Sequence, residues 1–475
     1  MQAVALINSR DVLLLPVNKR AVKTTHVVLE EQANTFACSV FLEKKSIMNN
    51  SEIITERAAV IAVMTDGRDE NDLNASLDEL ERLLETAGGH ACIRMVQRKE
   101  APEAATYLGS GKLKELRELC ENNEITLVVA DTDLSPSQIY NMEEALGCSD
   151  PGVSLRVIDR SMLILDIFAL HAQTAEGKLQ VEIAQLKYVA PRMTGKGKDL
   201  SRQGGGIGSR GPGESKLESD RRILKKRIRS LENELENVEK RRAVQRKARD
   251  SSGICKAAIV GYTNAGKSTL LNRLTDAGIL AEDKLFATLD PTTRRFTLPD
   301  GNEMLLVDTV GFIRNLPHHL IKSFRSTLDE AVYSDIIIIM ADASDPECGA
   351  QLSVTRNLLS ELGADGKPTL CVFNKCDRDG DVLPPVPEGI PAENIFYVSA
   401  KTGEGVDGFV EGLSRLVGER MSRQVFLIPF DRQDVVSALH RNANVESTDY
   451  TQDGIEITAI CDAATKGKYR QWLKN

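Results

Sequence analysis

The stretch that decides the fold is "ICKAAIVGYTNAGKSTLLNRLT", Ile254 to Thr275. It passes from an apolar, β-rich run into a glycine turn and then into a helical pattern. Its centre, "GYTNAGKS" from Gly261 to Ser268, matches G-x-x-x-x-G-K-[ST] with a strand before it and a helix after it. Glycines in such a turn let backbone N–H groups surround phosphate oxygens at a helix N-terminus. Lys267 would reach the β- and γ-phosphates, and the Ser268 hydroxyl would bind Mg²⁺.

Further apolar runs follow this stretch and predict a parallel sheet. The runs are "EMLLVD", "DIIIIMAD", "TLCVFN" and "NIFYVSA", and helical patterns at Leu316–Tyr333 and Ala350–Leu362 separate them. Strands that alternate with helices are typical of a parallel sheet covered on both faces. We therefore expect a P-loop domain over residues 254–421.

The tetrapeptide "NKCD", Asn374 to Asp377, indicates which base is bound. It follows the run "TLCVF", where a parallel sheet presents its ligand edge. A carboxylate at Asp377 can accept hydrogen bonds from the guanine N1–H and exocyclic amine. Adenine lacks that donor pair, and a site built around hydrogen bonds rejects such analogues. We expect Asn374 to tie this loop to the P-loop and Lys375 to lie along the base.

Two more motifs end strands in the same way. "DTVG" begins at Asp308, which can hold Mg²⁺ through water, and ends at Gly311, whose N–H can sense the γ-phosphate. "SAK" places the Ala400 N–H where it could bond guanine O6. Four motifs in this order, each at the end of a strand, predict a Mg²⁺-dependent GTPase.

The parts that respond to the γ-phosphate are less fully specified. "LFATLDPTTRR", Leu285 to Arg295, reads as a polar loop of the kind that orders around γ-phosphate and Mg²⁺. Thr288, Thr292 and Thr293 all offer a hydroxyl, and spacing does not choose among them. After "DTVG", where many GTPases carry a water-orienting glutamine, stands Phe312. We expect slow intrinsic hydrolysis, Phe312 packed beneath this segment, or both.

The rest of the chain predicts a multidomain α/β protein. Its units are an unassigned extension over 1–53, an α/β domain over 54–159, a helical hairpin over 160–253 and a small α+β unit over 422–475. The hairpin follows from Leu217, Leu224, Leu231 and Val238, which recur every seven residues, and from an antiparallel partner at roughly Asp159 to Val189.

Composition describes an acidic protein with one basic segment. The 475 residues carry a net charge of −9, yet Lys196 to Asp250 holds 17 lysines and arginines against 9 acidic residues. Such asymmetry often marks an element that faces nucleic acid. Nine scattered cysteines, no signal peptide pattern and apolar runs too short to span a bilayer predict a cytoplasmic protein, which we expect to be monomeric.

Within the basic segment lies "QGGGIGSRGPGE", Gln203 to Glu214, with six glycines. Its G-x-G-x-x-G spacing does not indicate a dinucleotide site, because no strand precedes it. A flexible linker is the simplest alternative. Its position between two helical arms and its flanking cations, including Arg202 and Arg210, favour a loop that probes RNA.

The order of these parts resembles the HflX family of bacterial ribosome-associated GTPases. The resemblance rests on "YLGSGKLKEL", "QGGGIGSRGPGESKLESDRR", "LFATLDPTTRR" and "DTVGFIRNLP", and it runs from about Glu56 to Met421. It implies binding to the large ribosomal subunit and its rRNA, and dissociation of stalled or stress-damaged ribosomes. It also implies Thr288 as the second metal ligand beside Ser268, and it matches Asn264 to an asparagine that resembles a potassium ligand in cation-activated GTPases.

Motifs and resemblance together give the expected site. Lys267, Thr288 and Gly311 are expected to serve catalysis. Residues expected to contact GTP or GDP are Gly261, Tyr262, Thr263, Asn264, Ala265, Gly266, Lys267, Ser268, Thr269, Phe286, Ala287, Thr288, Leu289, Asp290, Asp308, Thr309, Val310, Gly311, Asn374, Lys375, Cys376, Asp377, Ser399, Ala400 and Lys401. Residues expected to contact rRNA are Arg202, Gly205, Gly206, Ser209 and Arg210. The alternative function is a GTP-dependent switch that binds non-ribosomal proteins through its coiled coil.

Overall fold

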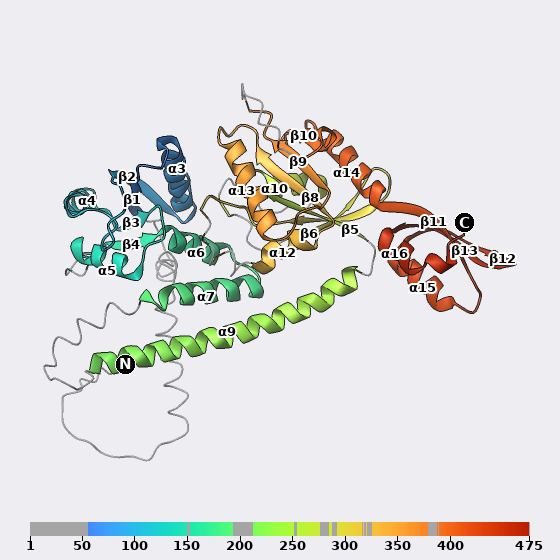
Figure 1. Cartoon of the computed structure of the whole chain (residues 1–475), viewed down its shortest axis with the longest axis horizontal. Coiled ribbons are helices and arrows are strands. Elements are labelled where there is room, and N and C mark those ends of the chain that lie inside the picture. The colour runs from blue at the N-terminus through green and yellow to red at the C-terminus, as the bar shows by residue number, and fades with distance from the viewer. Residues whose placement is uncertain are drawn as a thin grey trace, which may run out of the picture.

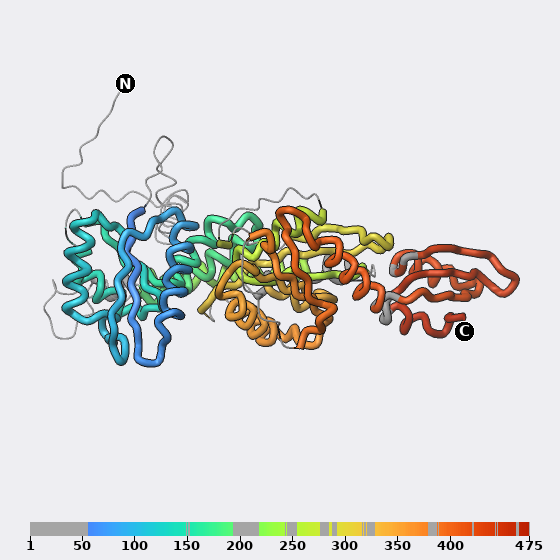
Figure 2. Tube along the Cα trace, turned by 90° about the horizontal axis from the view of Figure 1, so that it is seen from above, coloured from blue at the N-terminus to red at the C-terminus, as the bar shows by residue number. Residues whose placement is uncertain are grey.

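The computed structural model describes residues 56–148, 150, 153–192, 212–250, 254–275, 285–286, 292–315, 317, 320, 325–378, 387 and 389–474. Within these residues, three β-sheets follow one another along the chain, and a long helix runs beneath the first two (Figure 1). Viewed from above, the sheets lie in a row with the central one in the middle (Figure 2). The predicted multidomain α/β fold is confirmed.

The N-terminal sheet has four parallel strands in the order β2-β1-β3-β4. These are β1 (Glu56–Met64), β2 (Gly89–Arg98), β3 (Leu127–Ala130) and β4 (Arg156–Asp159). One face packs against α3 (Glu70–Thr86) and α6 (Arg160–His171), and the other against α4 (Ser110–Asn122) and α5 (Pro136–Ala145). Because helices cover both faces, β1 is apolar and buried over most of its length.

Two helices form the expected antiparallel arms. They are α7 (Ala175–Val189) and α9 (Pro212–Asp250), and Leu224 and Leu231 of α9 are buried against Ile183 and Leu186 of α7. Ion pairs between the arms, such as Arg227–Glu182, flank this apolar seam.

The predicted helical segment over roughly 159–189 consists of two helices, and it is the second, α7, that packs against α9. Asp159 ends β4, and its carboxylate caps α6 by accepting a hydrogen bond from the Met162 N–H. The chain then turns at Ala172, and the Thr174 side chain caps α7 by accepting from the Gly177 N–H. Only the first turn of a helix has backbone N–H groups without a partner in the helix. A side chain that accepts from such a group therefore favours the start of a separate helix at α7.

The central sheet has six strands in the order β10-β9-β8-β5-β7-β6. They are β5 (Cys255–Gly261), β6 (Thr292–Thr297), β7 (Glu303–Asp308), β8 (Ile336–Asp342), β9 (Thr369–Asn374) and β10 (Ile395–Tyr397). All neighbours are parallel except β6, which runs antiparallel to β7. The expected polar loop over 285–295 is therefore wrong at its end, because Thr292 and Thr293 pair with Asp308 and Val307 at the sheet edge.

Helices cover both faces of this sheet. On one face lie α10 (Lys267–Thr275) and α14 (Val406–Arg420), and on the other α12 (Arg325–Tyr333) and α13 (Cys348–Glu361). Of the predicted helix over 316–333, the structure describes α12 over Arg325–Tyr333 and a helical Leu320, while residues 316, 318, 319 and 321–324 lie outside the described residues. The α12–α13 face shares one apolar cluster with α3 and α6, and the Phe168 and Phe286 rings meet edge to face at 4.7 Å.

The C-terminal sheet is antiparallel, in the order β11-β13-β12. Its strands are β11 (Met421–Ile428), β12 (Asn444–Thr451) and β13 (Gly454–Asp462); with it go α15 (Gln433–Asn442), α16 (Ala463–Lys468) and the 3-10 turn η3 (Arg470–Trp472). Of the helices described anywhere in the structure, none is long and apolar enough to cross a membrane.

Candidate nucleotide site

The phosphate loop joins β5 to α10, as its sequence predicts. Asn264 and Gly266 have positive φ angles of 62° and 93°, so the loop turns sharply before Lys267 begins the helix. A side chain at Gly266 would collide with the Asn374 amide, which explains why glycine is needed there. The loop brings the backbone N–H groups of a helix start to one point, and such a point binds anions.

Lys267 is buried beneath this loop. Its Nζ donates to the carbonyls of Gly261 at 3.2 Å and Tyr262 at 2.9 Å. Burial lowers the pKa of Lys267 to about 8, and the nearby Asp308 carboxylate opposes that shift. A phosphate beside Nζ would favour the charged form, so nucleotide binding and protonation of this amine are coupled.

Ser268 and Asp308 form the oxygen pair expected for a magnesium ion. The Ser268 hydroxyl donates to the Asp308 carboxylate at 2.6 Å, and Asp308 is fully buried where β7 ends. Hydroxyl and carboxylate oxygens suit Mg²⁺, which in nucleotide sites takes few protein ligands and completes its shell with phosphates and water. The residues therefore fit the ion, which would neutralise charge on the phosphates.

The base-recognition residues converge from two strand ends. The Asn374 side chain donates to the Ala265 carbonyl at 2.8 Å, so β9 and the P-loop are tied together as expected. The Ser399 hydroxyl donates to Asp377 at 2.6 Å and holds the pKa of this carboxyl below its usual value. Asp377 is thus kept as the anion that guanine recognition requires.

Two neighbours of the base site differ from the simple expectation. The Ala400 N–H, expected to bond guanine O6, donates to Asn374 Oδ1 at 2.8 Å, so contact with O6 requires that bond to be shared or exchanged. The Lys375 ammonium pairs with Asp342 at 2.8 Å. This pair fixes the direction of the Lys375 side chain at the edge of the sheet.

The segment after β7 lies against the P-loop. The Thr263 N–H donates to the Phe312 carbonyl at 2.8 Å, and the Phe312 N–H donates to the Gly261 carbonyl at 3.0 Å. A side chain at Gly311 would lie 2.7 Å from the Thr263 methyl group, so only glycine allows this approach. Phe312 is 2% exposed, which confirms that it packs beneath the segment.

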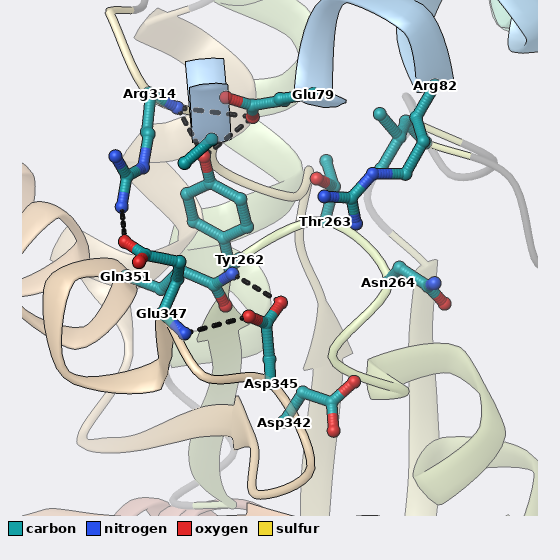
Figure 3. A pocket seen from close by; sticks show the side chains of 12 residues that line it. Glu79, Arg82, Tyr262, Thr263, Asn264, Arg314, Asp342, Asp345, Glu347 and Gln351 are labelled. Atoms are coloured by element: carbon teal, nitrogen blue, oxygen red, sulfur yellow. Dashed lines mark hydrogen bonds and ion pairs between the residues drawn. The ribbon is translucent and has the colours of Figure 1, made fainter. Parts of the chain in front are cut away.

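Sequence reasoning missed a polar cluster that joins the N-terminal unit to this site (Figure 3). The Tyr262 hydroxyl donates to Glu79 of α3 at 2.6 Å and accepts from the Arg314 N–H at 2.6 Å. Buried Arg160 of α6 pairs with the same Glu79 at 2.8 Å and with Asp131 at 3.0 Å. Burial, with the Glu79 carboxylate next, raises the pKa of Tyr262 and keeps it a hydrogen-bond donor.

The only local signal for this cluster was a large polar residue, Tyr262, inside the P-loop motif. Several predicted site residues cannot be compared with the structure. Ala287, Thr288, Leu289 and Asp290, and the rRNA-contact set Arg202, Gly205, Gly206, Ser209 and Arg210, lie outside the described residues.

A mostly parallel sheet whose carboxyl edge carries a P-loop, a "DTVG" segment and an "NKCD" loop defines the class of P-loop GTPases. Family models agree with this class along the chain. They are described as GTP-binding GTPase N-terminal over residues 74–169, GTP-binding GTPase Middle Region over 171–249 and 50S ribosome-binding GTPase over 256–375.

Curated relatives give the family. The chain is 47% identical over 407 residues to GTPase HflX of Lacrimispora saccharolytica, which covers 86% of this chain and 93% of that relative. It is 39% identical to GTPase HflX of Escherichia coli, over 84% of this chain and 92% of that protein. A GTP-binding protein of Sulfolobus solfataricus, solved with GDP, is 25% identical over 77% of this chain, with a TM-score of 0.41. The chain belongs to the HflX GTPase family and is an enzyme that binds and hydrolyses GTP.

Proposed function

We propose that this GTPase associates with the large ribosomal subunit and dissociates stalled or stress-damaged ribosomes. The observation that carries the proposal is the match of residues 256–375 to the 50S ribosome-binding GTPase model in a chain of the HflX family. In this proposal, the affinity of the protein for the large subunit depends on which nucleotide it holds, and GTP hydrolysis releases it from the ribosome.

In this proposal the motif residues take the roles that their positions allow. Lys267 neutralises the β- and γ-phosphates, Ser268 and Thr288 hold Mg²⁺, and the Gly311 N–H contacts the γ-phosphate. Asn374 supports the P-loop, and Asp377 selects guanine. We place the unit boundaries near residues 54, 160, 254 and 422, as the sequence pattern predicts.

The charge of α9 supports an RNA partner. Six exposed cations lie within nine residues toward the end of α9 that adjoins the glycine-rich segment: Arg221, Arg222, Lys225, Lys226, Arg227 and Arg229. Lysine and arginine side chains that neutralise phosphates release counterions, and this gives RNA binding its strength and its salt dependence. The glycine-rich loop, with Arg202 and Arg210, would contact rRNA beyond this end.

The packing of α9 does not favour the alternative, a switch that binds protein partners through its coiled coil. That reading requires the apolar seam of α9 to face a partner, but Leu231 is 1% exposed and packs against α7 of the same chain.

The test is GTP turnover by the protein alone, with large subunits, and with an equal mass of unrelated structured RNA, alongside Lys267→Ala as an inactive control. We expect strong stimulation by large subunits only. Equal rates in all three reactions would refute the ribosome assignment. Sedimentation of intact ribosomes with the factor and a non-hydrolysable GTP analogue then tests dissociation, since a splitting factor must increase the free subunits.

A further inference from the structure

One face of α3 lies over the phosphate loop. Asp72, Ala75, Glu79 and Arg82 are spaced three or four residues apart, so they share a side of the helix. Asp72 pairs with Arg314 at 2.8 Å and Glu79 accepts from Tyr262, while Ala75 and Arg82 line the same pocket as the P-loop residues. The N-terminal unit therefore contributes side chains to a pocket that adjoins the P-loop at Tyr262, Thr263 and Asn264.

Arg82 is the cation on this face that points toward the loop. Figure 3 shows its side chain extending from α3 with the guanidinium beside Thr263, on the side of the loop where Asn264 lies. Both of these P-loop residues line the pocket with Arg82. The guanidinium is exposed, its Nε donates to the Asp78 carbonyl at 3.3 Å, and among the described residues it has no ion pair. Its charge is thus available to an anion.

The backbone of Arg82 is held against the site on both sides. Three residues before it, Glu79 is bonded to Tyr262 of the P-loop and to Arg160. Four residues after it, the Thr86 hydroxyl accepts from the Leu285 N–H at 3.2 Å, and Leu285 begins the "LFATLD" segment. A helix fixed at both neighbouring turns carries its side chain to a defined place, as preorganised catalysis requires.

The position of the γ-phosphate follows from the rest of the site. It must lie beside the Lys267 ammonium and the Gly311 N–H, and Gly311 touches Thr263. The Arg82 guanidinium lies beside Thr263 (Figure 3), and Thr263 is the residue against which Gly311 packs. Phe312, fully packed, offers no polar group there.

We propose that Arg82 is a catalytic arginine that the N-terminal unit supplies in cis to the γ-phosphate of GTP. In the reaction, a water oxygen forms a bond to the γ-phosphorus while the bond to the β–γ bridging oxygen breaks. The electron pair of that bond leaves on GDP, and the proton of the water passes to the released phosphate. Arg82 stabilises the negative charge that develops on the bridging and γ-oxygens, the role an arginine finger has in other GTPases. This inference rests on the proposed placement of GTP in the P-loop.

The experiment compares Arg82→Ala and Arg82→Lys with the wild-type chain under saturating GTP. The control is Arg117→Ala, an exposed arginine on the outer helix α4, distant from the site (Figure 1). We expect Arg82→Ala to lower kcat about 100-fold, as when one preorganised donor to a transition state is removed. Arg82→Lys should recover only part of the rate, because lysine cannot bond two oxygens in a fork. Arg117→Ala should hydrolyse GTP as the wild type does.

Two binding readouts separate this role from others. The Kd of a fluorescent GTP analogue should change less than threefold in Arg82→Ala, whereas tight binding of GDP with aluminium fluoride, which mimics the transition state, should be lost. An unchanged or increased kcat would overturn the proposal, and so would a loss confined to GTP affinity. If Lys267→Ala binds GTP as tightly as the wild type, the placement of GTP itself is wrong, whatever Arg82 does.

Discussion

Replacing Arg160 by methionine should strongly destabilise the N-terminal unit. The Arg160 side chain is 2% exposed and pairs with Glu79 at 2.8 Å and Asp131 at 3.0 Å, and these carboxylates are 6% and 1% exposed. Methionine fills similar volume but leaves buried Glu79 without a cation among the described residues, whereas Asp131 keeps Arg68 at 3.3 Å. Breaking a buried ion pair on one side costs about 3–5 kcal/mol. Arg160 also donates to the Arg314 carbonyl at 3.3 Å, so contact with the central unit should weaken as well.

The assay is urea unfolding followed by circular dichroism, with Arg117→Met as the control. Arg117 pairs with Glu121 and Asp150 at the surface, where ion pairs contribute about 0–1 kcal/mol. The double variant Arg160→Met/Glu79→Gln should regain part of the loss, because one of the two charges is removed with its cation. A loss below about 1 kcal/mol in Arg160→Met would contradict the assignment of this arginine as the charge that neutralises Glu79.

Three further results are expected. Asp377→Asn should weaken GTP binding at least about 100-fold, because two charge-assisted hydrogen bonds of about 1.5–3 kcal/mol each are lost. The variant should instead bind xanthosine triphosphate, which presents a carbonyl in place of the guanine amine. Equal GTP titrations for the variant and the wild type would contradict this. Burial lowers the pKa of Lys267 to about 8, and the amine must be charged to hold phosphate, so GTP affinity should fall about tenfold per pH unit above pH 8. Calorimetry in two buffers should show that the protein takes up a proton when it binds GTP, and Lys267→Ala should lack this uptake. Neutralising Arg202 and Arg210 should lower the affinity for large subunits and reduce the salt slope by about 1 per lost phosphate contact, and an unaltered slope would remove these residues from the RNA interface.

The sequence predicts most of the central sheet because β5, β7, β8 and β9 are continuous apolar runs, and β5, β7 and β9 end in motifs; the polar strand β6, "TTRRFT", gives no such signal. β8 is buried over nearly its full length, and such a run has few other interpretations. β12 carries no comparable signal, since "NVESTDYT" is largely polar and Tyr450 is 76% exposed at the sheet edge. β12 is a strand because it pairs with β13, and its own sequence does not predict it.

In the candidate site, too, the sequence predicts only the contacts that a local motif encodes. Motifs predicted the contacts made within a few residues of a strand end, such as Ser268 with Asp308 or Asn374 with Ala265. Glu79 and Arg82 lie more than 170 residues before the P-loop on an ordinary amphipathic helix, where a charged residue predicts only exposure to solvent. Their placement depends on how two units pack, and local patterns do not encode that.

The Arg242 side chain attaches one end of the long helix α9 to the rest of the protein. It pairs with Glu176 of α7 at 2.9 Å and with Glu330 of α12 at 2.6 Å. This end of α9 is therefore fixed to both the other arm and the central unit. From Arg242 to the start of α9 at Pro212 the helix rises about 45 Å, at about 1.5 Å per residue. A turn of only about 5° there, too small to disturb the packed cores, sweeps the far tip through about 4 Å, more than the width of an atom. A helix of this length therefore converts a small rotation beside the central unit into a displacement of several ångströms at its far end.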